Sequence, residues 1–402
     1  MSAYSNAAQI ELTRESAELE RRLEKITAEL NAYPLRVNKA RWQVNYDAAD
    51  YIAGSLIQYC RYLAKSDLFR PNSPADCRNA LGVESSDKDT LTALVNAGSD
   101  LAEAVLDARS AIACLGQLRK WTTVAEYGAV QPVWNSLGTP HGRYTSERPC
   151  LTNRIRPIRQ TIEPDPGFSF LSMDLSQAEY VVWTSLSGDL NLSELFLSGQ
   201  DFHTAMAQLV LTLVPDWDLK GVEPRQAGKT LNFSILYLMM PYTLAIKLGC
   251  SLAVARKIIK TYYKRARTGI RYIHRVLADA RELGFVETYF GRRRHCGEYQ
   301  NGAGERERHE IEKTLWSHRN AGTAAEIVKL KQLAIWETLR QEGFTASQVR
   351  LSINLFDQLI WSVRDDLITD VQPIIIEIWN RRVPGFLPFR SQITIGKNWG
   401  EL

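Results

Sequence analysis

The chain has 402 residues, with 49 basic against 45 acidic side chains and a formal net charge of +4. This length and a hydrophobic content of 45% exclude a disordered chain and a disulfide-stapled miniprotein, and they predict about two to three subdomains. The six cysteines form no CxxC pair, so we expect reduced thiols rather than a zinc site. No secretory signal or apolar membrane span is recognisable, so we expect a cytoplasmic protein with no membrane partner.

Helical signals dominate residues 1–125. Apolar residues at heptad spacing predict a long helix from Ile10 to Leu30, and Ser99 is a suitable N-cap for another helix that ends near Trp121. The following segment, 138–159, is loop-like and carries five arginines against a single acid. This segment is the first local concentration of positive charge along the chain.

Two later segments have the character of strands. The apolar run from Phe168 to Met173 predicts a short buried strand that ends at Asp174. After a helical stretch at 190–283, the odd positions from 349 to 363 are apolar except for Asp357, which predicts a hairpin with Asp357 at or beside its turn. This order of elements predicts an α+β protein whose sheet is assembled from distant segments.

Two carboxylates adjoin these apolar strands. Asp174 follows the first strand, and Asp357 interrupts the second one 183 residues later. A carboxylate beside a buried strand is costly unless it is paired or binds a cation. Two of them on neighbouring strands would suit a pair of Mg²⁺ ions about 3.5–4 Å apart, an arrangement used for phosphoryl or nucleotidyl transfer. Alternatively, Asp174 caps a helix that begins near Leu175 and Asp357 only occupies a turn.

The segment 221–241 predicts a helix that has Pro224 in its first turn and stops at Pro241, leaving about 16 helical residues. Four residues form a stripe along one side of this helix, two cationic residues followed by two aromatic ones. The cationic residues can hold phosphates, and the aromatic residues can stack on a base. Alternatively, a solvated basic face simply runs into a core-facing aromatic face. The residues of this stripe lie four apart on one side of the predicted helix: Arg225, Lys229, Phe233 and Tyr237.

These motifs together resemble those of DNA polymerase family A, the bacterial DNA polymerase I type. The order and spacing of three motifs agree, and the resemblance is strong from residue 138 to the C-terminus. The segment that resembles motif A is Asp174-Leu-Ser-Gln-Ala-Glu179, and the segment that resembles motif B is Arg225-x3-Lys229-x2-Asn232-Phe233-x3-Tyr237. Where motif C has His-Asp-Glu, this chain has Phe356-Asp357-Gln358. Further matching segments are 142–153, Asp201-Phe202-His203, 287–293, Gly322-Thr-Ala-Ala-Glu326 and Gly396-Lys-Asn398-Trp399.

The resemblance implies a role for each matching residue. Asp174 and Asp357 would bind two Mg²⁺ ions, for which Mn²⁺ can substitute, and Lys229 would be the third catalytic residue, neutralising developing charge. Gln358 would help to position the primer end. The incoming nucleotide would be bound by Arg225, Lys229, Phe233, Tyr237, Gln177, Glu179 and His203. Primer-template DNA would be bound by Arg143, Asn153, Arg292 and Arg293, whose charges are alternatively only solvated at the surface.

Two positions concern which nucleotide sugars the site would accept. Glu179 matches the family's steric gate, which fills the space that a 2′-hydroxyl would need, and therefore favours deoxynucleoside triphosphates. Phe233 stands where some relatives have Tyr, and a phenylalanine cannot replace the 3′-hydroxyl that a dideoxynucleotide lacks. We therefore expect the site to discriminate against dideoxynucleotides.

Several positions depart from the family pattern. In motif C, Gln358 replaces Glu and Phe356 replaces His, so the primer end is expected to be positioned differently although Asp357 is kept. Other replacements predict a reshaped template pocket and altered checking of the primer terminus in the minor groove. These replacements are Leu175 for Tyr, Val181 for Arg, Ser234 and Leu238 for Gly, Ser317 for Asn and Ala321 for Gln.

The implied fold is an α+β right hand. Its helical thumb would cover 1–130, its antiparallel-sheet palm 131–190 and 286–402, and its helical fingers 191–285. The implied reaction is template-directed addition of deoxynucleotides to a primer 3′-end. Because the first helix already resembles thumb, we expect no exonuclease domain and no proofreading in this chain.

The expected setting is the cytoplasm of a bacterial or phage-infected cell, in DNA replication or repair. A separate exonuclease or replisome proteins would be further partners of this chain. Two other functions stay open. One is a primer-independent RNA polymerase of the same plan, against which Glu179 and Phe233 argue. The other is a catalytically weak DNA-binding accessory protein, which the altered motif C would fit.

Overall fold

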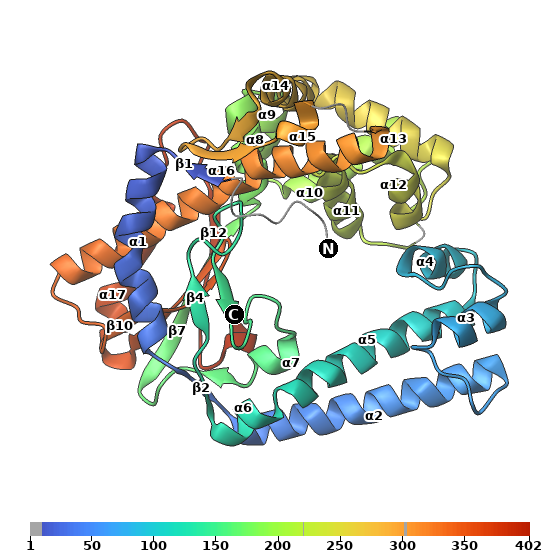
Figure 1. The fold of residues 1–402 in the computed structure, drawn as a ribbon, viewed down its shortest axis with the longest axis horizontal. Coiled ribbons are helices and arrows are strands. Elements are labelled where there is room, and N and C mark those ends of the chain that lie inside the picture. The colour runs from blue at the N-terminus through green and yellow to red at the C-terminus, as the bar shows by residue number, and fades with distance from the viewer. Residues whose placement is uncertain (1–9, 220, 301–303) are drawn as a thin grey trace.

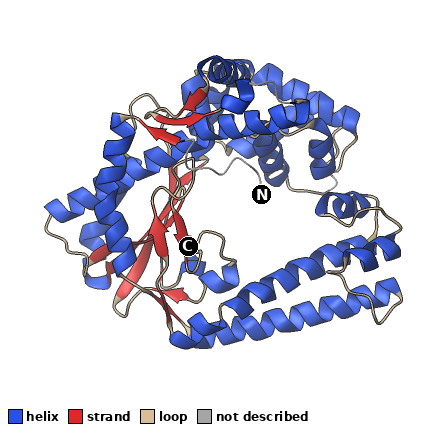
Figure 2. Cartoon of the chain, in the orientation of Figure 1, coloured by secondary structure: helices blue, strands red, loops and turns tan. Residues whose placement is uncertain are grey.

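The computed structural model describes residues 10–219, 221–300 and 304–402. These residues form three regions (Figure 1). A region of mixed strands and helices lies at one side, and two helical regions extend from it and face each other. Strands gather in the mixed region, and helices make up nearly all of the other two (Figure 2). The predicted α+β class is confirmed.

The main sheet has four antiparallel strands in the order β10-β11-β7-β12. As predicted, it joins segments far apart in sequence, because β7 (Phe168–Ser176) pairs with β11 (Gln358–Arg364) on one side and with β12 (Arg390–Gly396) on the other. The predicted hairpin is also present, since β10 (Val349–Leu355) pairs with β11 across the two-residue turn that contains Asp357. Three smaller antiparallel sheets are formed by β1-β9-β8, β3-β2-β6 and β4-β5. Their strands are β1 (Ile10–Leu12), β2 (Leu35–Val37), β3 (Ala129–Val130), β4 (Val133–Asn135), β5 (Thr145–Glu147), β6 (Ile162–Glu163), β8 (Phe285–Glu287) and β9 (Arg292–His295).

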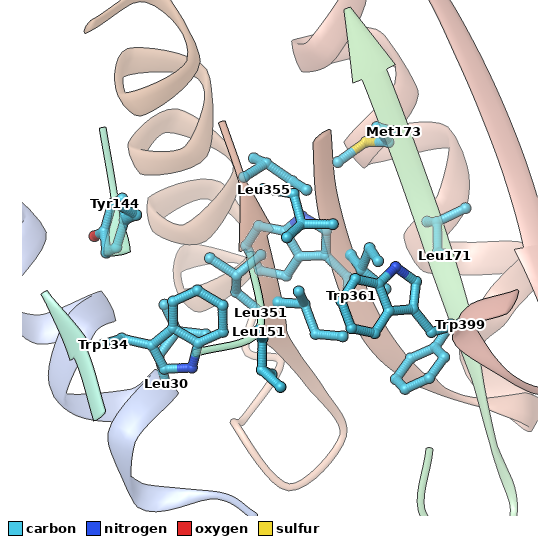
Figure 3. Packing of buried hydrophobic residues seen from close by; sticks show 14 of the residues in the cluster. Leu30, Trp134, Tyr144, Leu151, Leu171, Met173, Leu351, Leu355, Trp361 and Trp399 are labelled. Atoms are coloured by element: carbon cyan, nitrogen blue, oxygen red, sulfur yellow. The ribbon is translucent and has the colours of Figure 1, made fainter. Parts of the chain in front are cut away.

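One hydrophobic core joins the main sheet to segments from the start of the chain. Trp361 of β11 is fully buried, and Leu351, Leu30 and Trp134 belong to the same cluster (Figure 3). Burying a large apolar side chain contributes roughly 1.5–3 kcal/mol. The helices of this region are α16 (Glu305–Gln341) and α17 (Ile368–Asn380), and α17 packs on β11 and β12. Shorter helical turns are α7 (Arg156–Arg159), η3 (Asp365–Leu367) and η4 (Trp399–Glu401).

The first helix, α1 (Arg14–Ala32), starts later than predicted. Residues Ile10–Leu12 form β1 instead and pair with β9. The heptad apolar residues of α1 are buried against α16 and β10. The division into thumb, palm and fingers stays a prediction, but this packing places α1 with the main sheet rather than with the helical pair that follows it.

A long helical pair projects from the sheet region (Figure 1). It consists of α2 (Lys39–Ala64) and α5 (Asp100–Lys120), and the predicted N-cap is confirmed because Ser99 Oγ accepts from the Ala102 amide at 3.3 Å. Between them lie α3 (Pro74–Leu81) and α4 (Lys88–Asn96), and α6 (Thr122–Tyr127) follows α5. At the far end, Asn96 Nδ2 donates to the Ile246 carbonyl at 3.2 Å, so the tip of the pair contacts the opposite helical region.

The opposite region is a helical block with its own hydrophobic core. Its helix α11 begins at Pro224 as predicted, but the prediction for the end was wrong. The helix stops at Leu236, and Pro241 starts the next helix instead of ending this one, since proline suits a first turn. The helices are α8 (Ala178–Ser187), α9 (Leu190–Leu197), α10 (Phe202–Leu213), α11 (Pro224–Leu236), α12 (Pro241–Leu248), α13 (Leu252–Arg265), α14 (Arg267–Leu283) and α15 (Gly297–Gln300).

Two sequence expectations concern the chain as a whole. No disulfide forms among the described residues, in keeping with the expected reduced thiols. Within the described ranges, none of the helices combines the length and the apolar character needed to cross a bilayer.

Candidate active site

The predicted carboxylates meet at one end of the main sheet, where the β10–β11 turn lies beside the last residues of β7. Asp174 lies inside β7 and pairs in register with Gln358, and the Leu175 amide donates to the Asp357 carbonyl at 3.0 Å. The alternative in which Asp174 caps a helix is wrong, because β7 continues to Ser176 and α8 begins only at Ala178. Segments 183 residues apart in sequence therefore bring these two side chains to one place.

The two carboxyl groups disfavour each other's charge. Loss of water and then the neighbouring Asp357 raise the pKa of Asp174 to about 7. The pKa of Asp357 is also raised, chiefly because protein around its concave site displaces water, although the side chain remains exposed and Arg143 opposes the shift. No described side chain forms a hydrogen bond or ion pair with the Asp174 carboxyl. A charged pair of this kind is costly to keep until a cation binds.

A pocket of about 550 Å³ opens over these carboxylates. It contains eight of the residues that the sequence predicted and brings them together from β7, α8, α10, α11 and the β10–β11 turn. The predicted residues in its lining are Asp174, Gln177, Glu179, His203, Arg225, Lys229, Phe233 and Asp357.

Helix α11 faces the carboxylates with its basic stripe. Arg225 and Lys229 are exposed, and Phe233 is half-buried behind them. The helix can lie this close to α10 because residue 228 is glycine: a Cβ there would stand 2.0 Å from the His203 carbonyl oxygen. Gly228 is therefore needed for this packing of the two helices, and sequence reasoning missed it.

His203 is buried at the base of the stripe. Loss of water lowers the pKa of His203 to about 4, so its imidazole is neutral at pH 7. The tautomer follows from its neighbours. Tyr262 donates to Asn232 Oδ1 at 2.9 Å, which makes Asn232 Nδ2 the donor to His203 Nδ1, also at 2.9 Å. The remaining proton therefore resides on Nε2.

Glu179 connects three parts of the site. Arg143 Nη2 donates to Glu179 Oε1 at 2.6 Å, and the Tyr237 hydroxyl donates to Glu179 Oε2 at 2.6 Å. The charge of Glu179 helps to raise the pKa of Tyr237 above its usual range, after loss of water. Tyr237 lies outside the pocket lining, but this bond ties the end of α11 to the start of α8.

Asp201 is a further residue that the motif analysis noted without giving it a role. It caps α10 by accepting from the Thr204 amide at 2.9 Å, and it pairs with Arg225 at 3.3 Å. Arg390 of β12 also lines the pocket and donates to the Phe196 carbonyl at 2.6 Å. No sequence signal identified Arg390, because only the pairing of β12 with β7 brings it here.

The remaining predicted residues lie elsewhere. Gln358 Nε2 donates to Ser172 Oγ at 2.9 Å on β7, beside Asp174 in register. Asn153 is exposed in a turn, and Arg293 on β9 pairs with Glu287 and Glu11. None of these three residues lines the pocket.

The prediction that Arg292 binds DNA phosphate was wrong. Its side chain is 1% exposed and forms buried ion pairs with Glu20 and Glu326. A guanidinium enclosed in this way cannot reach a bound duplex. The run of three arginines at 292–294 gave no sign of this, because burial of Arg292 depends on α1 and α16 covering β9.

A second pocket, of about 680 Å³, lies beyond the α11–α12 turn. It is lined by Leu238, Met239, Tyr263, His274 and Glu312, among others, and contains none of the predicted site residues. The smaller pocket therefore remains the candidate active site.

The donors present fit divalent cations. Among the described residues, no three or more His, Cys, Asp or Glu side chains are grouped to hold a metal by themselves. Mg²⁺ is commonly bound by one or two carboxylates together with substrate phosphates and water. Asp174 and Asp357 supply such a pair, and their mutual repulsion favours a cation between them.

Comparison with known proteins identifies the family. The family model of DNA polymerase family A matches residues 11–401, and the chain belongs to this family. Its relatives include the thermostable DNA polymerase I of Thermus filiformis, 29% identical over 280 residues, and the DNA polymerase I of Pseudomonas aeruginosa, 31% identical over 280 residues. Each alignment covers 68% of this chain but only 33% and 30% of the relative, so the chain spans about a third of these proteins.

A solved structure supports the fold. The polymerase domain of Pol1 from M. smegmatis, in complex with a DNA primer-template and dNTP, superimposes with a TM-score of 0.84. The match covers 96% of this chain and 71% of that one at 20% sequence identity. The arrangement of helices and strands is thus that of a family A polymerase domain.

Proposed function

We propose that this chain is a template-directed DNA polymerase that adds deoxynucleotides to a primer 3′-end. The observation that carries the proposal is the pocket in which Asp174 and Asp357 face Arg225 and Lys229. Paired carboxylates opposite a cationic helix suit the transfer of a nucleotidyl group from a triphosphate. Family membership supports this reaction, and the M. smegmatis domain was solved with the corresponding DNA and nucleotide.

Asp174 and Asp357 would hold two Mg²⁺ ions, or Mn²⁺ in their place. When bound, the ions would supply Lewis acidity at the primer 3′-hydroxyl and neutralise triphosphate charge. Because the pKa of Asp174 is about 7, this carboxyl is only partly ionised near neutral pH until a cation is present. Cation binding would therefore release protons from the site.

The side chains of α10 and α11 would bind the triphosphate. Lys229 is unpaired among the described residues, whereas Arg225 would exchange its contact with Asp201 for a phosphate. His203 would donate from Nε2–H without adding charge. Arg225 and Lys229 would thus bring two positive charges to the triphosphate, and His203 one neutral donor. Gln177 lies beside them, where its side chain donates to Asp201.

Glu179 and Phe233 would select the sugar. Glu179 is fixed from two sides by Arg143 and Tyr237, so it can act as a rigid barrier to a 2′-hydroxyl. We expect deoxynucleotides to be preferred over ribonucleotides, which would exclude the RNA polymerase alternative. Exchange of Glu179 for Ala should relax this preference.

The side chain of Phe233 offers a sharper test of sugar selection. Phe233→Tyr adds a hydroxyl on the face of α11 that lines the pocket, and we expect it to raise dideoxynucleotide incorporation at least about 10-fold relative to deoxynucleotides. Competition between the two in primer extension measures this ratio. An unchanged ratio would remove Phe233 from the sugar site.

We propose that Arg143, Asn153 and Arg293 contact the DNA. Because cationic side chains would contact phosphates, binding of primer-template DNA should weaken steeply with rising salt concentration. We also propose that these 402 residues, tested alone, do not degrade a 3′-mismatched primer. The described elements are accounted for by the two helical regions and the sheet region between them. A separate exonuclease or replisome proteins would supply proofreading.

Primer extension by the wild-type protein beside Asp174→Ala and Asp357→Ala tests the proposal. We expect Mg²⁺-dependent extension by the wild type and none above background by either variant. Binding of primer-template by all three proteins without extension by any would favour the accessory-protein alternative, which the neutral Gln358 motivates.

A further inference from the structure

Phe356 adjoins the pocket but has no part in the proposed reaction. It forms the β10–β11 turn together with Asp357, and its φ is +61°. Bulky side chains rarely adopt this left-handed conformation, which glycine or asparagine would occupy without strain. Strained residues of this kind cluster at functional sites. The presence of a phenyl ring here therefore needs an explanation beyond the turn.

The ring contacts Arg143. The guanidinium carbon of Arg143 lies 5.0 Å from the centroid of the Phe356 ring, within the range of a cation–π interaction. The same guanidinium forms the 2.6 Å ion pair with Glu179. Arg143 is thus held between an aromatic ring on one strand turn and a carboxylate on α8.

Both contacts are partly shielded from water. The side chains of Arg143 and Glu179 are 28% and 15% exposed, respectively, so their interaction is screened less than a surface pair would be. Arg143 itself comes from the loop before β5, where its amide donates to Thr139 Oγ1 at 3.0 Å. The long side chain has many rotamers, and its tip is restricted by the Phe356 ring, the Glu179 carboxylate and a hydrogen bond with Tyr237.

We propose that Phe356 is a positioning residue for substrate binding: its ring fixes the guanidinium of Arg143 at the edge of the pocket, beside Glu179 and Asp357. Arg143 then meets the primer end and the sugar of the incoming nucleotide in one orientation. The inference rests on the proposed function and deepens it. It also assigns a use to a residue that departs from the family's usual histidine.

Phe356→Leu removes the ring and keeps an apolar side chain. We expect the KM for the correct deoxynucleotide to rise about 5-fold, equivalent to about 1 kcal/mol at 1.4 kcal/mol per factor of ten. We expect kcat to change less than about twofold, because the reacting groups are untouched. Phe356→Tyr keeps the aromatic face and should restore the wild-type KM.

A matched control is available outside the site. Tyr33 also lies under an arginine, with the Arg350 guanidinium carbon 4.6 Å from its ring centroid. Tyr33→Leu therefore removes a cation–π contact of the same kind away from the pocket. We expect this variant to leave KM and kcat at their wild-type values.

A double-mutant cycle with Arg143→Met separates positioning from a merely structural role. If Phe356 acts through Arg143, the double variant will have the same KM as Arg143→Met alone, whereas independent effects would multiply. Multiplying effects, or an unchanged KM in Phe356→Leu, would overturn the inference. A wild-type protein that extends no primer would instead overturn the proposed function.

Discussion

The cluster of carboxylates at the pocket and the cluster between α1 and α16 differ in their partners. Asp174 and Asp357 line the pocket, and no cationic side chain among the described residues pairs with Asp174. Glu20 and Glu326 lie between α1 and α16, where Arg292 and Lys329 pair with them. The comparison shows two roles for acidic side chains. Buried acids that pair with cationic side chains hold helices and strands together, whereas unpaired acids that face each other favour binding of an added cation.

Burial also differs between the clusters. All four side chains of the paired cluster are at most 6% exposed, and Lys329 additionally donates to the Ser136 carbonyl at 2.8 Å. Loss of water lowers the pKa of Lys329 to about 8, although Glu20 opposes the shift. The acids of the first cluster instead line an open pocket. Accessibility, rather than charge alone, therefore separates the binding site from the structural ion pairs.

The largest expected effect concerns activity. Asp357→Asn is nearly isosteric and removes one negative charge from the pocket, so we expect primer extension to fall at least about 1,000-fold, equivalent to about 4 kcal/mol. Because charge repulsion with Asp174 is relieved, the free energy of unfolding should not decrease. Single-turnover extension and urea unfolding measure the two quantities. If Asp357→Asn lost both activity and folding stability, Asp357 would be a structural acid like Glu20, and the proposed difference between the two clusters would be contradicted.

The paired cluster should respond in the opposite way. Glu20→Gln leaves Arg292 and Lys329 without their shared partner, and we expect the free energy of unfolding to fall by about 3–5 kcal/mol. Activity per folded molecule should be unchanged at low temperature. Asp216→Asn is the control, because its pair with Lys257 is exposed and contributes little. Equal urea midpoints for Glu20→Gln and wild type would contradict a structural role for the cluster.

A smaller effect is expected from pH. His141 and His318 pack together near Arg292, and loss of water, followed for His141 by nearby arginines, lowers the pKa of His141 to about 4 and that of His318 to about 3. At these two positions the imidazoles bind protons near pH 6.5 in the unfolded chain but not in the folded chain. The contribution of these two histidines to stability should therefore fall as pH drops below 6.5, by about 2 kcal/mol for each at pH 5.

Urea unfolding between pH 7.5 and pH 5 measures this dependence. His318→Gln should show a shallower slope than the wild type, because it removes one of the two imidazoles whose pKa is lowered by burial. A wild-type slope in His318→Gln would show that other groups cause the loss of stability.

The sequence predicted the pocket better than its surroundings. The period-two pattern around Asp357 and the apolar run before Asp174 were sufficient to predict the strands beside both acids, because strand alternation is local. That these strands are neighbours depends on the pairing of β7 with β11, which no local pattern shows. The stripe on α11, like the strands, was predicted from a local pattern. The end of that helix was not, since a proline can either stop one helix or start the next.

Burial of individual charges could not be predicted. Arg292 lies in a basic run that suggests a surface, and only the packing of α1 and α16 over β9 shows that it is enclosed. The need for glycine at position 228 likewise arises from the approach of α10, because no local pattern shows how closely these two helices pack. Such properties depend on tertiary contacts rather than on local pattern.

The most direct test of the central claim counts bound cations. Electron paramagnetic resonance can measure Mn²⁺ bound by the protein with a dideoxy-terminated primer-template and the matching deoxynucleotide. Two Mn²⁺ ions per complex are expected for the wild type and for Glu20→Gln, and this binding should be lost in the Asp174→Asn/Asp357→Asn double variant. Two bound ions in that double variant would contradict the assignment of the pocket acids as the metal site.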